Sequence, residues 1–297
     1  MSKDNRAHLG TDLLLMLTAA IWGFAFVAQR AGMEFIGPFL FNAVRFALGT
    51  VVLLPLIFLS RGKKLRSQRV PIKYGILTGL ILFAGASLQQ VGLVYTTAGN
   101  AGFVTGLYVV IVPVLGLFWG QSCGKGTWAG AALAVSGMFL LTTAGSSRML
   151  SGDIIVFAGA IFWAVHIQLI SRLMKRYDAL SLAALQFGCC SLLSGLAALL
   201  TEKLSLSGIR MAAVPILYGG LVSVGIAYTL QIVAQKRAHP AHAAIIMSLE
   251  AVFALIGGWI MLAEPVTLKG TAGGALMLAA MISSAREQSK VRRSAGL

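Results

Sequence analysis

The chain has 297 residues, of which 58% are hydrophobic and only 11% are charged. A soluble domain is about half apolar and about a quarter charged, so a single soluble core is excluded because too few polar side chains remain to cover its surface. The net charge of +15 does not indicate a nucleic-acid partner, because the 24 Lys and Arg residues lie in short clusters between long apolar runs. The composition predicts an all-α integral membrane protein.

Ten runs are long and apolar enough to cross a membrane as helices, which takes about 20 residues each. In the first half of the chain they cover residues 13–29, 39–59, 72–95, 98–119 and 127–145. In the second half they cover residues 154–171, 181–200, 213–235, 241–263 and 270–284. Some connections are as short as two residues, so consecutive helices must be antiparallel and the bundle compact.

The distribution of basic residues predicts the orientation, because Lys and Arg accumulate in cytoplasmic loops. With the N-terminus inside, 18 of them fall in cytoplasmic segments and 5 in outer segments, and Arg45 lies within a helix. We therefore expect both termini in the cytoplasm and the protein in a bacterial-type cytoplasmic (inner) membrane. Lys3 and Arg6 precede the first apolar run as they would in a cleaved signal peptide, but the internal repeat argues against cleavage.

The second half of the chain repeats the first at an offset of 141 to 144 residues. The paired positions are Asp12 with Asp153, Trp22 with Trp163, Arg45 with Gln186, Gln89 with Gln231, Asn100 with His242, and Tyr108 with Glu250. The first apolar run matches the sixth, which is internal, so the first run is expected to remain in the mature protein. The pattern predicts two five-helix repeats, residues 1–148 and 149–297, in a single membrane domain.

Five is an odd number, so the two repeats must have opposite orientations in the membrane. Inverted repeats of this kind are typical of secondary transporters, which open a site near the midplane to one side and then to the other. A duplicated scaffold without a transport role is the alternative.

Several short motifs have the order and spacing of a known family. They are Trp22-Gly23 in the first run, Arg45 after Pro38 in the second, and Glu264-Pro265 closing the ninth. With ten spans in two inverted halves, the chain from residue 12 to 284 resembles the EamA branch of the drug/metabolite transporter superfamily. Gln186 in place of a second Arg, and Ser122 near the position of Glu264, depart from a strict repeat. The resemblance implies efflux or exchange of small metabolites, often amino acids or related amphiphiles.

Polar and ionisable side chains inside spans are costly to bury, so they mark functional positions. We expect a central substrate-binding cavity lined by Trp22, Trp163, Tyr108, Gln89, His166 and Glu250. A second set, placed above and below the midplane, is expected to act in gating or coupling: Arg45, Asn100, Gln186, Gln231 and His242.

Alternatives stay open for individual residues. The Trp pair fits a cavity or ordinary helix packing. Glu250, the carboxylate well inside a span, fits either a buried ion pair with Arg45 or a proton-coupling or substrate-binding group. His166 and His242 could relay protons or be simple hydrogen-bonding partners.

Three functions compete at this point. The first is a secondary transporter, an exporter or exchanger, of a small organic metabolite such as an amino acid. The second is a flippase for a lipid or lipid-linked sugar. The third, a membrane-embedded enzyme, is disfavoured because the chain has no H-E-x-x-H, G-x-S-x-G or P-loop motif.

The expected partners are a small-molecule substrate, the lipid bilayer and, as a candidate coupling ion, the proton. We expect no nucleic acid and no cofactor or metal, since the three cysteines have no metal-ligand spacing. We expect a monomer or a homodimer.

Overall fold

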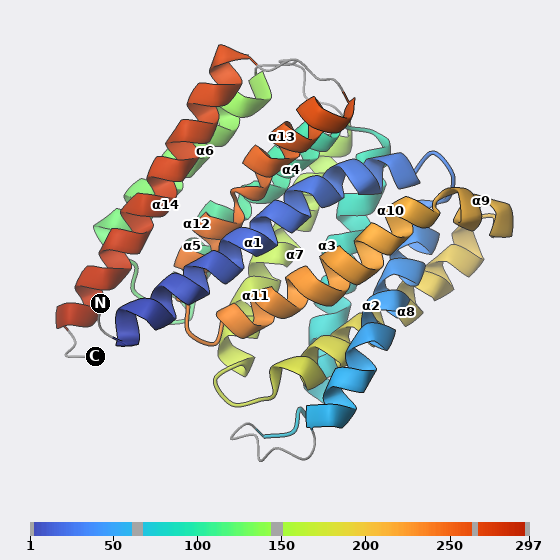
Figure 1. Cartoon of the computed structure of the whole chain (residues 1–297), viewed down its shortest axis with the longest axis horizontal. Helices are drawn as coiled ribbons and strands as arrows, with labels where there is room; N and C mark the ends of the chain where they lie inside the picture. The colour runs from blue at the N-terminus through green and yellow to red at the C-terminus, as the bar shows by residue number, and fades with distance from the viewer. Residues whose placement is uncertain (1–2, 61–67, 144–150, 263–266, 295–297) are drawn as a thin grey trace.

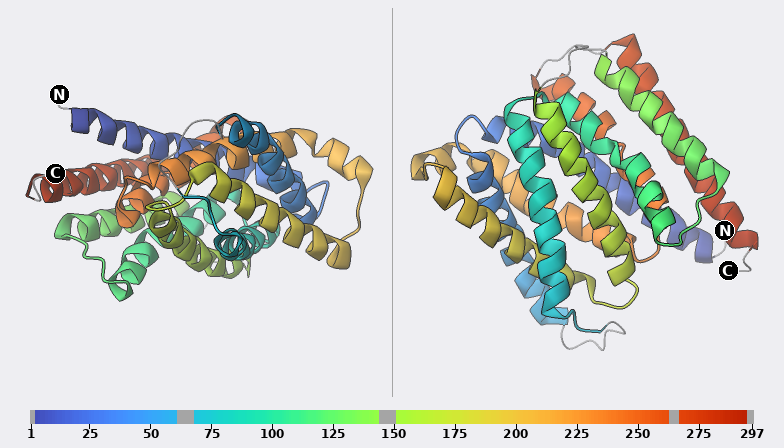
Figure 2. Two further views of the ribbon diagram at one scale, coloured as in Figure 1. Left: turned by 90° about the horizontal axis from the view of Figure 1, so that it is seen from below. Right: turned by 180° about the vertical axis from the view of Figure 1, so that it is seen from behind.

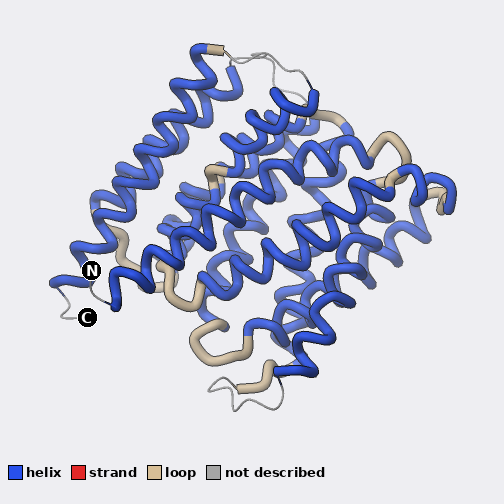
Figure 3. The backbone as a smooth tube through the Cα atoms, in the orientation of Figure 1, coloured by secondary structure: helices blue, strands red, loops and turns tan. Residues whose placement is uncertain are grey.

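The computed structural model describes residues 3–60, 68–143, 151–262 and 267–294, and each regular element within these ranges is a helix (Figure 3). The predicted all-α class is confirmed for this part of the chain. The expected boundary between the repeats, at residues 148 and 149, and the Glu264-Pro265 motif lie outside the described residues.

Each predicted span coincides with one helix or with consecutive shorter helices. The first half contains α1 (Lys3–Gly32), α2 (Pro38–Ser60), α3 (Ile72–Val94), α4 (Ala98–Gly106), α5 (Tyr108–Phe118) and α6 (Lys125–Thr143). The second half contains α7 (Ser151–Leu173), α8 (Ala179–Thr201), α9 (Leu206–Met211), α10 (Ala213–Leu217), the π-helix η1 (Tyr218–Tyr228), α11 (Thr229–Ala234), α12 (Pro240–Met247), α13 (Glu250–Leu262) and α14 (Leu268–Ser294).

Three of the predicted spans are interrupted, which the apolar pattern did not predict. Residues 98–119 divide at Leu107 into α4 and α5, and residues 241–263 divide at Ser248 into α12 and α13. Leu107 and Ser248 have nearly the same backbone angles, with φ −61° at both and ψ −13° and −14°. In the remaining interrupted span, residues 213–235, the 11-residue π-helix η1 separates α10 from α11. π-Helical turns are frequent at functional sites.

Among the described residues, eight helical segments are long and apolar enough to cross a membrane. They correspond to the predicted spans other than the fifth and the tenth, which coincide with α6 and α14. Large apolar side chains such as Phe58, Leu59 and Leu200 are exposed, whereas polar ones such as Gln89 and Gln186 are buried. This is the surface that a lipid environment favours, so the chain is an integral membrane protein.

The helices form a bundle in which α6 and α14 pair along one edge and α2 and α8 lie toward the opposite side (Figure 1). Figures 1 and 2 place both chain termini close together at one end of this bundle. We call this the terminal end and the opposite one the distal end. The connection between α11 and α12 lies at the terminal end, and the connections from α1 to α2 and from α3 to α4 lie at the distal end (Figure 1).

Helices from the two halves of the chain pack directly against one another. α2 packs on α8, α3 on α7, and α1 on both α13 and η1. The carboxylate of Glu202, at the C-terminus of α8, accepts hydrogen bonds of 2.8 Å from the N–H groups of Phe39 and Leu40 at the start of α2. A Cβ atom at Gly23 of α1 would lie 2.6 Å from the carbonyl oxygen of Glu250, so this glycine allows α1 to contact the start of α13.

Candidate functional site

Aromatic rings from both halves of the chain meet inside the bundle around Tyr228, at the end of η1. The ring centroid of Tyr228 lies 4.6 Å from that of Trp22 and 6.0 Å from that of Trp163. Phe46 and Phe187 lie 6.1 Å and 5.8 Å from Tyr228. Tilted and edge-to-face ring pairs at these distances are favourable, so Tyr228 joins α1, α2, α7 and α8 at one point.

A chain of side-chain hydrogen bonds runs beside these rings. The indole N–H of Trp163 donates to Gln89 Oε1 at 2.9 Å, and Gln89 Nε2 donates to Gln29 Oε1 at 3.4 Å. Gln29 Nε2 in turn donates to the carbonyl of Ala25 at 3.1 Å. This chain connects α7, α3 and α1, and it fixes the orientation of Trp163.

Arg45 is buried in α2 and is held by groups of its own helix. Its Nε donates to Asn42 Oδ1 at 2.9 Å, and its guanidinium carbon lies 5.0 Å and 5.6 Å from the ring centroids of Phe46 and Phe41. Both Arg45 and Glu250 are described, and no ion pair joins them. The buried Arg45–Glu250 pair considered from the sequence is therefore wrong, because Asn42 and the two rings hold the guanidinium beside α2.

A small cavity of about 30 Å³ lies among these groups. Its lining residues are Trp22, Phe26, Gln29, Arg45, Gln89, Thr105, Tyr108, Trp163, Ile167, Ser223, Tyr228, Gln231 and Glu250. Five of the six residues expected to bind substrate are in this set. The exception is His166, which lies 2.9 Å from Gln186 Oε1 through its Nε2 and does not line the cavity.

The lining contains four pairs of residues that the repeat alignment relates. They are Trp22 with Trp163, Phe26 with Ile167, Gln89 with Gln231, and Tyr108 with Glu250. Tyr108 directly follows the break at Leu107, and Glu250 lies two residues after Ser248. The carboxyl group of Glu250 lies beside the Tyr108 hydroxyl. Each half of the chain thus contributes matching positions to one cavity.

The residues expected to act in gating or coupling are divided between several places. Arg45 and Gln231 line the cavity, whereas Gln186 binds His166 outside its lining. Asn100 is half-buried in the first turn of α4 at the distal end, where its N–H donates to the Thr97 hydroxyl at 3.1 Å.

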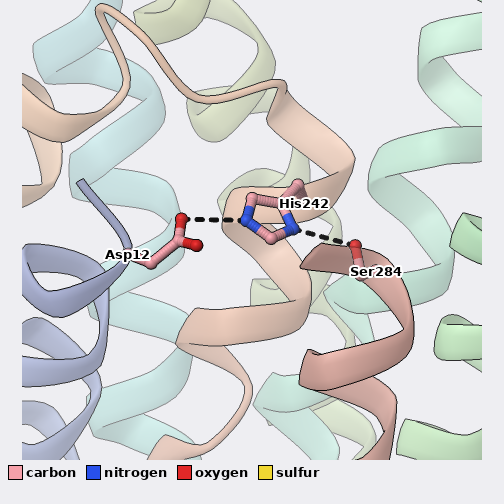
Figure 4. Close-up of polar contacts among 3 residues, drawn as sticks. All are labelled: Asp12, His242 and Ser284. Atoms are coloured by element: carbon pink, nitrogen blue, oxygen red, sulfur yellow. Dashed lines mark hydrogen bonds and ion pairs between the residues drawn. The ribbon is translucent and has the colours of Figure 1, made fainter. Parts of the chain in front are cut away.

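His242 lies near the terminal end, in a network that ties three helices together. Its Nε2 lies 2.9 Å from Asp12 Oδ1, and its Nδ1 lies 2.9 Å from Ser284 Oγ. Figure 4 shows the three side chains pointing toward one another from α1, α12 and α14. At the distal end, the Thr96 hydroxyl donates to Asp153 Oδ1, and Asp153 is the repeat counterpart of Asp12.

Two lining residues that the sequence analysis missed are Tyr228 and Gln29. In the repeat alignment they fall on Ala86 and Ile170, so a search for paired polar or aromatic positions could not find them. The signal that was present is the polar or aromatic residue itself, inside an apolar run.

Comparison with known proteins identifies the family. The sequence profile of the EamA-like transporter family matches residues 9–143 and, a second time, residues 150–285. The chain belongs to the EamA-like transporter family. It is therefore a membrane transporter, as the family and its relatives are.

Three relatives illustrate the similarity. The chain is 32% identical to an uncharacterized transporter of Archaeoglobus fulgidus over 277 residues, which cover 93% of this chain and 85% of the relative. It is 25% identical to the uncharacterized transporter YvbV of Bacillus subtilis, with 97% and 95% covered. It is 32% identical to the uncharacterized inner membrane transporter YedA of Escherichia coli over 152 residues, 48% of this chain and 47% of the relative.

A solved crystal structure of another protein has the same fold. It superimposes on this EamA-like transporter with a TM-score of 0.78 at 18% sequence identity, covering 92% of this chain and 96% of the other. At this identity the likeness concerns the fold alone.

Proposed function

We propose that this EamA-like transporter is a secondary transporter that moves a small organic metabolite by alternating access. Its ten transmembrane helices form two inverted five-helix repeats, residues 1–148 and 149–297, in one membrane domain. The observation that carries this proposal is the buried cavity lined by four repeat-related pairs. A site built from matching positions of two halves can be opened by moving one half against the other.

The packing of the helices supports the inverted repeat. If α1 corresponds to α7, α4 to α12 and α5 to α13, the contact of α1 with α13 has its counterpart in the contact of α7 with α5. In the same way, the contact of α2 with η1 has its counterpart in that of α8 with α3. The equivalent breaks at Leu107 and Ser248 and the two successive matches of the family profile agree with this correspondence.

The polar groups of the cavity favour a small zwitterion with an apolar body. Arg45 Nη2, Trp22 Nε1 and Gln231 Oε1 are buried without hydrogen-bond partners, a state that a bound ligand would relieve. Arg45 suits a carboxylate and Glu250 an ammonium group, and the rings of Trp22 and Trp163 suit the apolar part between them. An amino acid or a similar amphiphile, exported or exchanged, has this chemistry.

The cavity must widen for such a cargo to enter. Its volume of about 30 Å³ holds roughly one water molecule, whereas small-ligand pockets usually measure about 300 to 1,000 Å³. The structure therefore corresponds to a state in which the cargo site is contracted, and alternating access supplies the expansion.

We infer that both termini are cytoplasmic and that the protein resides in a bacterial-type inner membrane as a monomer or homodimer. The excess of Lys and Arg in the segments on the side of the termini supports this orientation. If protons drive transport, Glu250→Gln removes the pH dependence of uptake into proteoliposomes. If uptake by Glu250→Gln keeps the wild-type pH dependence, Glu250 does not couple protons.

The test of the cargo site is ligand binding. Purified protein is screened by thermal shift against amino acids, nucleosides, sugars and cationic drugs, and the dissociation constant of the best ligand is then measured. Trp22→Ala and Trp163→Ala are expected to weaken binding about tenfold or more, because each removes a wall of the cavity. Trp259→Ala, which truncates an exposed Trp of α13, is the matched control.

Equal affinity of all three variants and wild type would refute the assigned site. A flippase would be indicated instead by stabilisation with lipid or lipid-linked sugar and none with the soluble ligands.

A further inference from the structure

A second, larger cavity lies at the terminal end of the bundle. It has a volume of about 350 Å³ and is formed by the end of α7, the connection from α5 to α6, the connection from α11 to α12, and α14. We call it the vestibule. It shares no lining residue with the central cavity.

The two cavities follow one another along the same helix faces. In α7, Ile167 lines the central cavity and Ser171, four residues later, lines the vestibule. In the same way, Gln231 of α11 lines the central cavity, and Gln235, which directly follows α11, lines the vestibule. Residues four apart lie on one face of a helix, about 6 Å along its axis. The vestibule is therefore a separate compartment about one helical turn from the central cavity.

Two buried polar groups of the vestibule have no partner within the protein. Ser171 Oγ and Gln235 Oε1 form no hydrogen bond, although the side chains are only 5% and 2% exposed. The amide of Gln235 is held in place, because its Nε2 donates to the carbonyl of Ile167 at 3.4 Å. Buried polar groups are usually hydrogen-bonded, so this hydroxyl donor and this amide acceptor are positioned for a ligand.

The charge of the vestibule is positive. Lys175, Lys236 and Arg237 line it, and Glu287 is the carboxylate in its lining. Arg172 is engaged elsewhere, since its guanidinium carbon lies 4.5 Å from the ring centroid of Trp119 and its Nη2 donates to the Trp119 carbonyl at 3.4 Å.

The two histidines of the vestibule differ in their surroundings. Burial, followed by the nearby His242 and Lys175, lowers the pKa of His239, so its imidazole is neutral at pH 7. His242 is bound to Asp12 and Ser284. Lys175 and Lys236 are exposed and line the vestibule, where both can contact an anion.

We propose that the vestibule is a binding site for a molecule that carries an anionic group, a carboxylate or a phosphate, next to a hydrogen-bond donor. Ser171 and the two lysines bind the anionic group, and Gln235 Oε1 accepts from the donor. Such a ligand could be a free metabolite or the headgroup of an anionic lipid such as phosphatidylglycerol. Ligand binding in the vestibule does not require transport, so it can hold or fail separately from the proposed function.

The experiment uses the full chain in phosphatidylcholine nanodiscs and isothermal titration with glycerol 3-phosphate, which has both groups. Methyl phosphate lacks the hydroxyl donor, and glycerol lacks the anion. We expect glycerol 3-phosphate to bind more tightly than either by at least fivefold. Equal binding of methyl phosphate and glycerol 3-phosphate would overturn the assigned role of Gln235.

Variants locate the site. Ser171→Ala and Lys175→Gln are each expected to weaken binding about tenfold, because each removes a hydrogen bond to a charged group. Lys203→Gln makes the same charge change at the distal end and is expected to leave binding unchanged. Lys175 is exposed, so its variant remains informative if Ser171→Ala does not fold. Unchanged affinity in Lys175→Gln, or an equal loss in Lys203→Gln, would overturn the site.

The source of the ligand is decided by lipid composition. In nanodiscs that contain phosphatidylglycerol, native mass spectrometry counts the lipid molecules retained by wild type and by Lys175→Gln. Retention that depends on Lys175, without binding of glycerol 3-phosphate, supports the site with a lipid headgroup as its occupant. Absence of both binding and Lys175-dependent retention overturns the proposal.

Discussion

The two ends of the bundle differ in how tightly their helices close. At the terminal end the vestibule of about 350 Å³ separates the end of α7 from α14. At the distal end α3 and α7 touch through two glycines, and a Cβ atom at Gly152 would overlap the Gly92 carbonyl oxygen and lie 2.8 Å from the carbonyl carbon of Tyr95. The described helices are therefore closely packed between α3 and α7 at the distal end and hollowed at the terminal end.

Equivalent aspartates act differently at the two ends. Asp153 accepts from the Thr96 hydroxyl at the closed end, and Asp12 binds His242, which also contacts Ser284, at the hollowed end. His242 contacts two partners through its two ring nitrogens, whereas Thr96 contacts Asp153 through one hydroxyl. The comparison teaches that an inverted repeat matches helix positions, while the chemistry at each end is set by the partners of the two aspartates, Thr96 and His242, which are not repeat counterparts.

The first prediction concerns access to the vestibule, where the expected effect is all-or-none. Cys123 lines the vestibule, so with Cys189 and Cys190 replaced by Ser it should react with a membrane-impermeant maleimide in inverted vesicles and not in right-side-out vesicles. A cysteine introduced by Lys203→Cys, in the connection from α8 to α9, should show the opposite pattern. Labelling of both positions from the same side would contradict the orientation.

The rate of that labelling should depend on pH in a specific way. Burial raises the pKa of the Cys123 thiol, and the thiolate is the reactive form. Cys123 should therefore react more slowly than free cysteine at pH 7, and its rate should keep rising at a pH where the rate of free cysteine has levelled off. A profile identical to that of free cysteine would mean that the vestibule is wider in the membrane.

The second prediction tests the closed end through stability. Gly152→Ala should destabilise the fold by about 1–3 kcal/mol, because the new methyl group meets backbone atoms that cannot rotate away. Gly124→Ala at the vestibule is the matched control, since the three atoms nearest to its methyl group all belong to the flexible side chain of Glu287. Thermal melts of the two purified variants should differ by about 2–4 °C for each kcal/mol. Equal melting temperatures would mean that the distal end is not tightly packed.

Much of the candidate site could be predicted from the sequence, because helical rise and the repeat determine depth. Trp22, Trp163, Tyr108 and Glu250 were expected at mid-depth, and all four line one cavity. Rotation about a helix axis is less well determined. His166, three residues after Trp163, binds Gln186 instead of lining the cavity, because residues three apart on a helix still differ by about 60° in direction.

A contact between distant residues could not be predicted where the repeat contains no equivalent contact. Asp12 and His242 are 230 residues apart, and their pairing depends on how α1 crosses α12. Tyr228 aligns with Ala86, so its position among four other aromatic rings breaks the repeat. The interrupted helices were missed because an apolar run reads the same with or without a break at Leu107.

The third prediction concerns the Asp12–His242–Ser284 network. Asp12→Ala removes the carboxylate that contacts His242 Nε2, an interaction worth about 1.5–3 kcal/mol, and should loosen α1 from α12 at the terminal end. Amide hydrogen exchange in the first turns of α12 should rise by about tenfold. Thr96→Val removes the counterpart bond at the distal end and should leave α12 protected. Faster exchange of α12 in Thr96→Val as well would show that the two ends are not independent.

The smallest effect is expected for the two repeat-related tryptophans, which differ in one hydrogen bond. Trp163→Phe should cost about 1 kcal/mol of stability, because it leaves Gln89 Oε1 without its donor, whereas the buried indole N–H of Trp22 has no partner to lose. Chemical denaturation of both variants measures this difference. In ligand binding the order should reverse: Trp22→Phe removes a donor that is free to meet the cargo and should weaken affinity more than Trp163→Phe does. If the two substitutions have equal effects in both measurements, the free N–H of Trp22 has no role in recognition, and the asymmetry between the halves of the cavity is only structural.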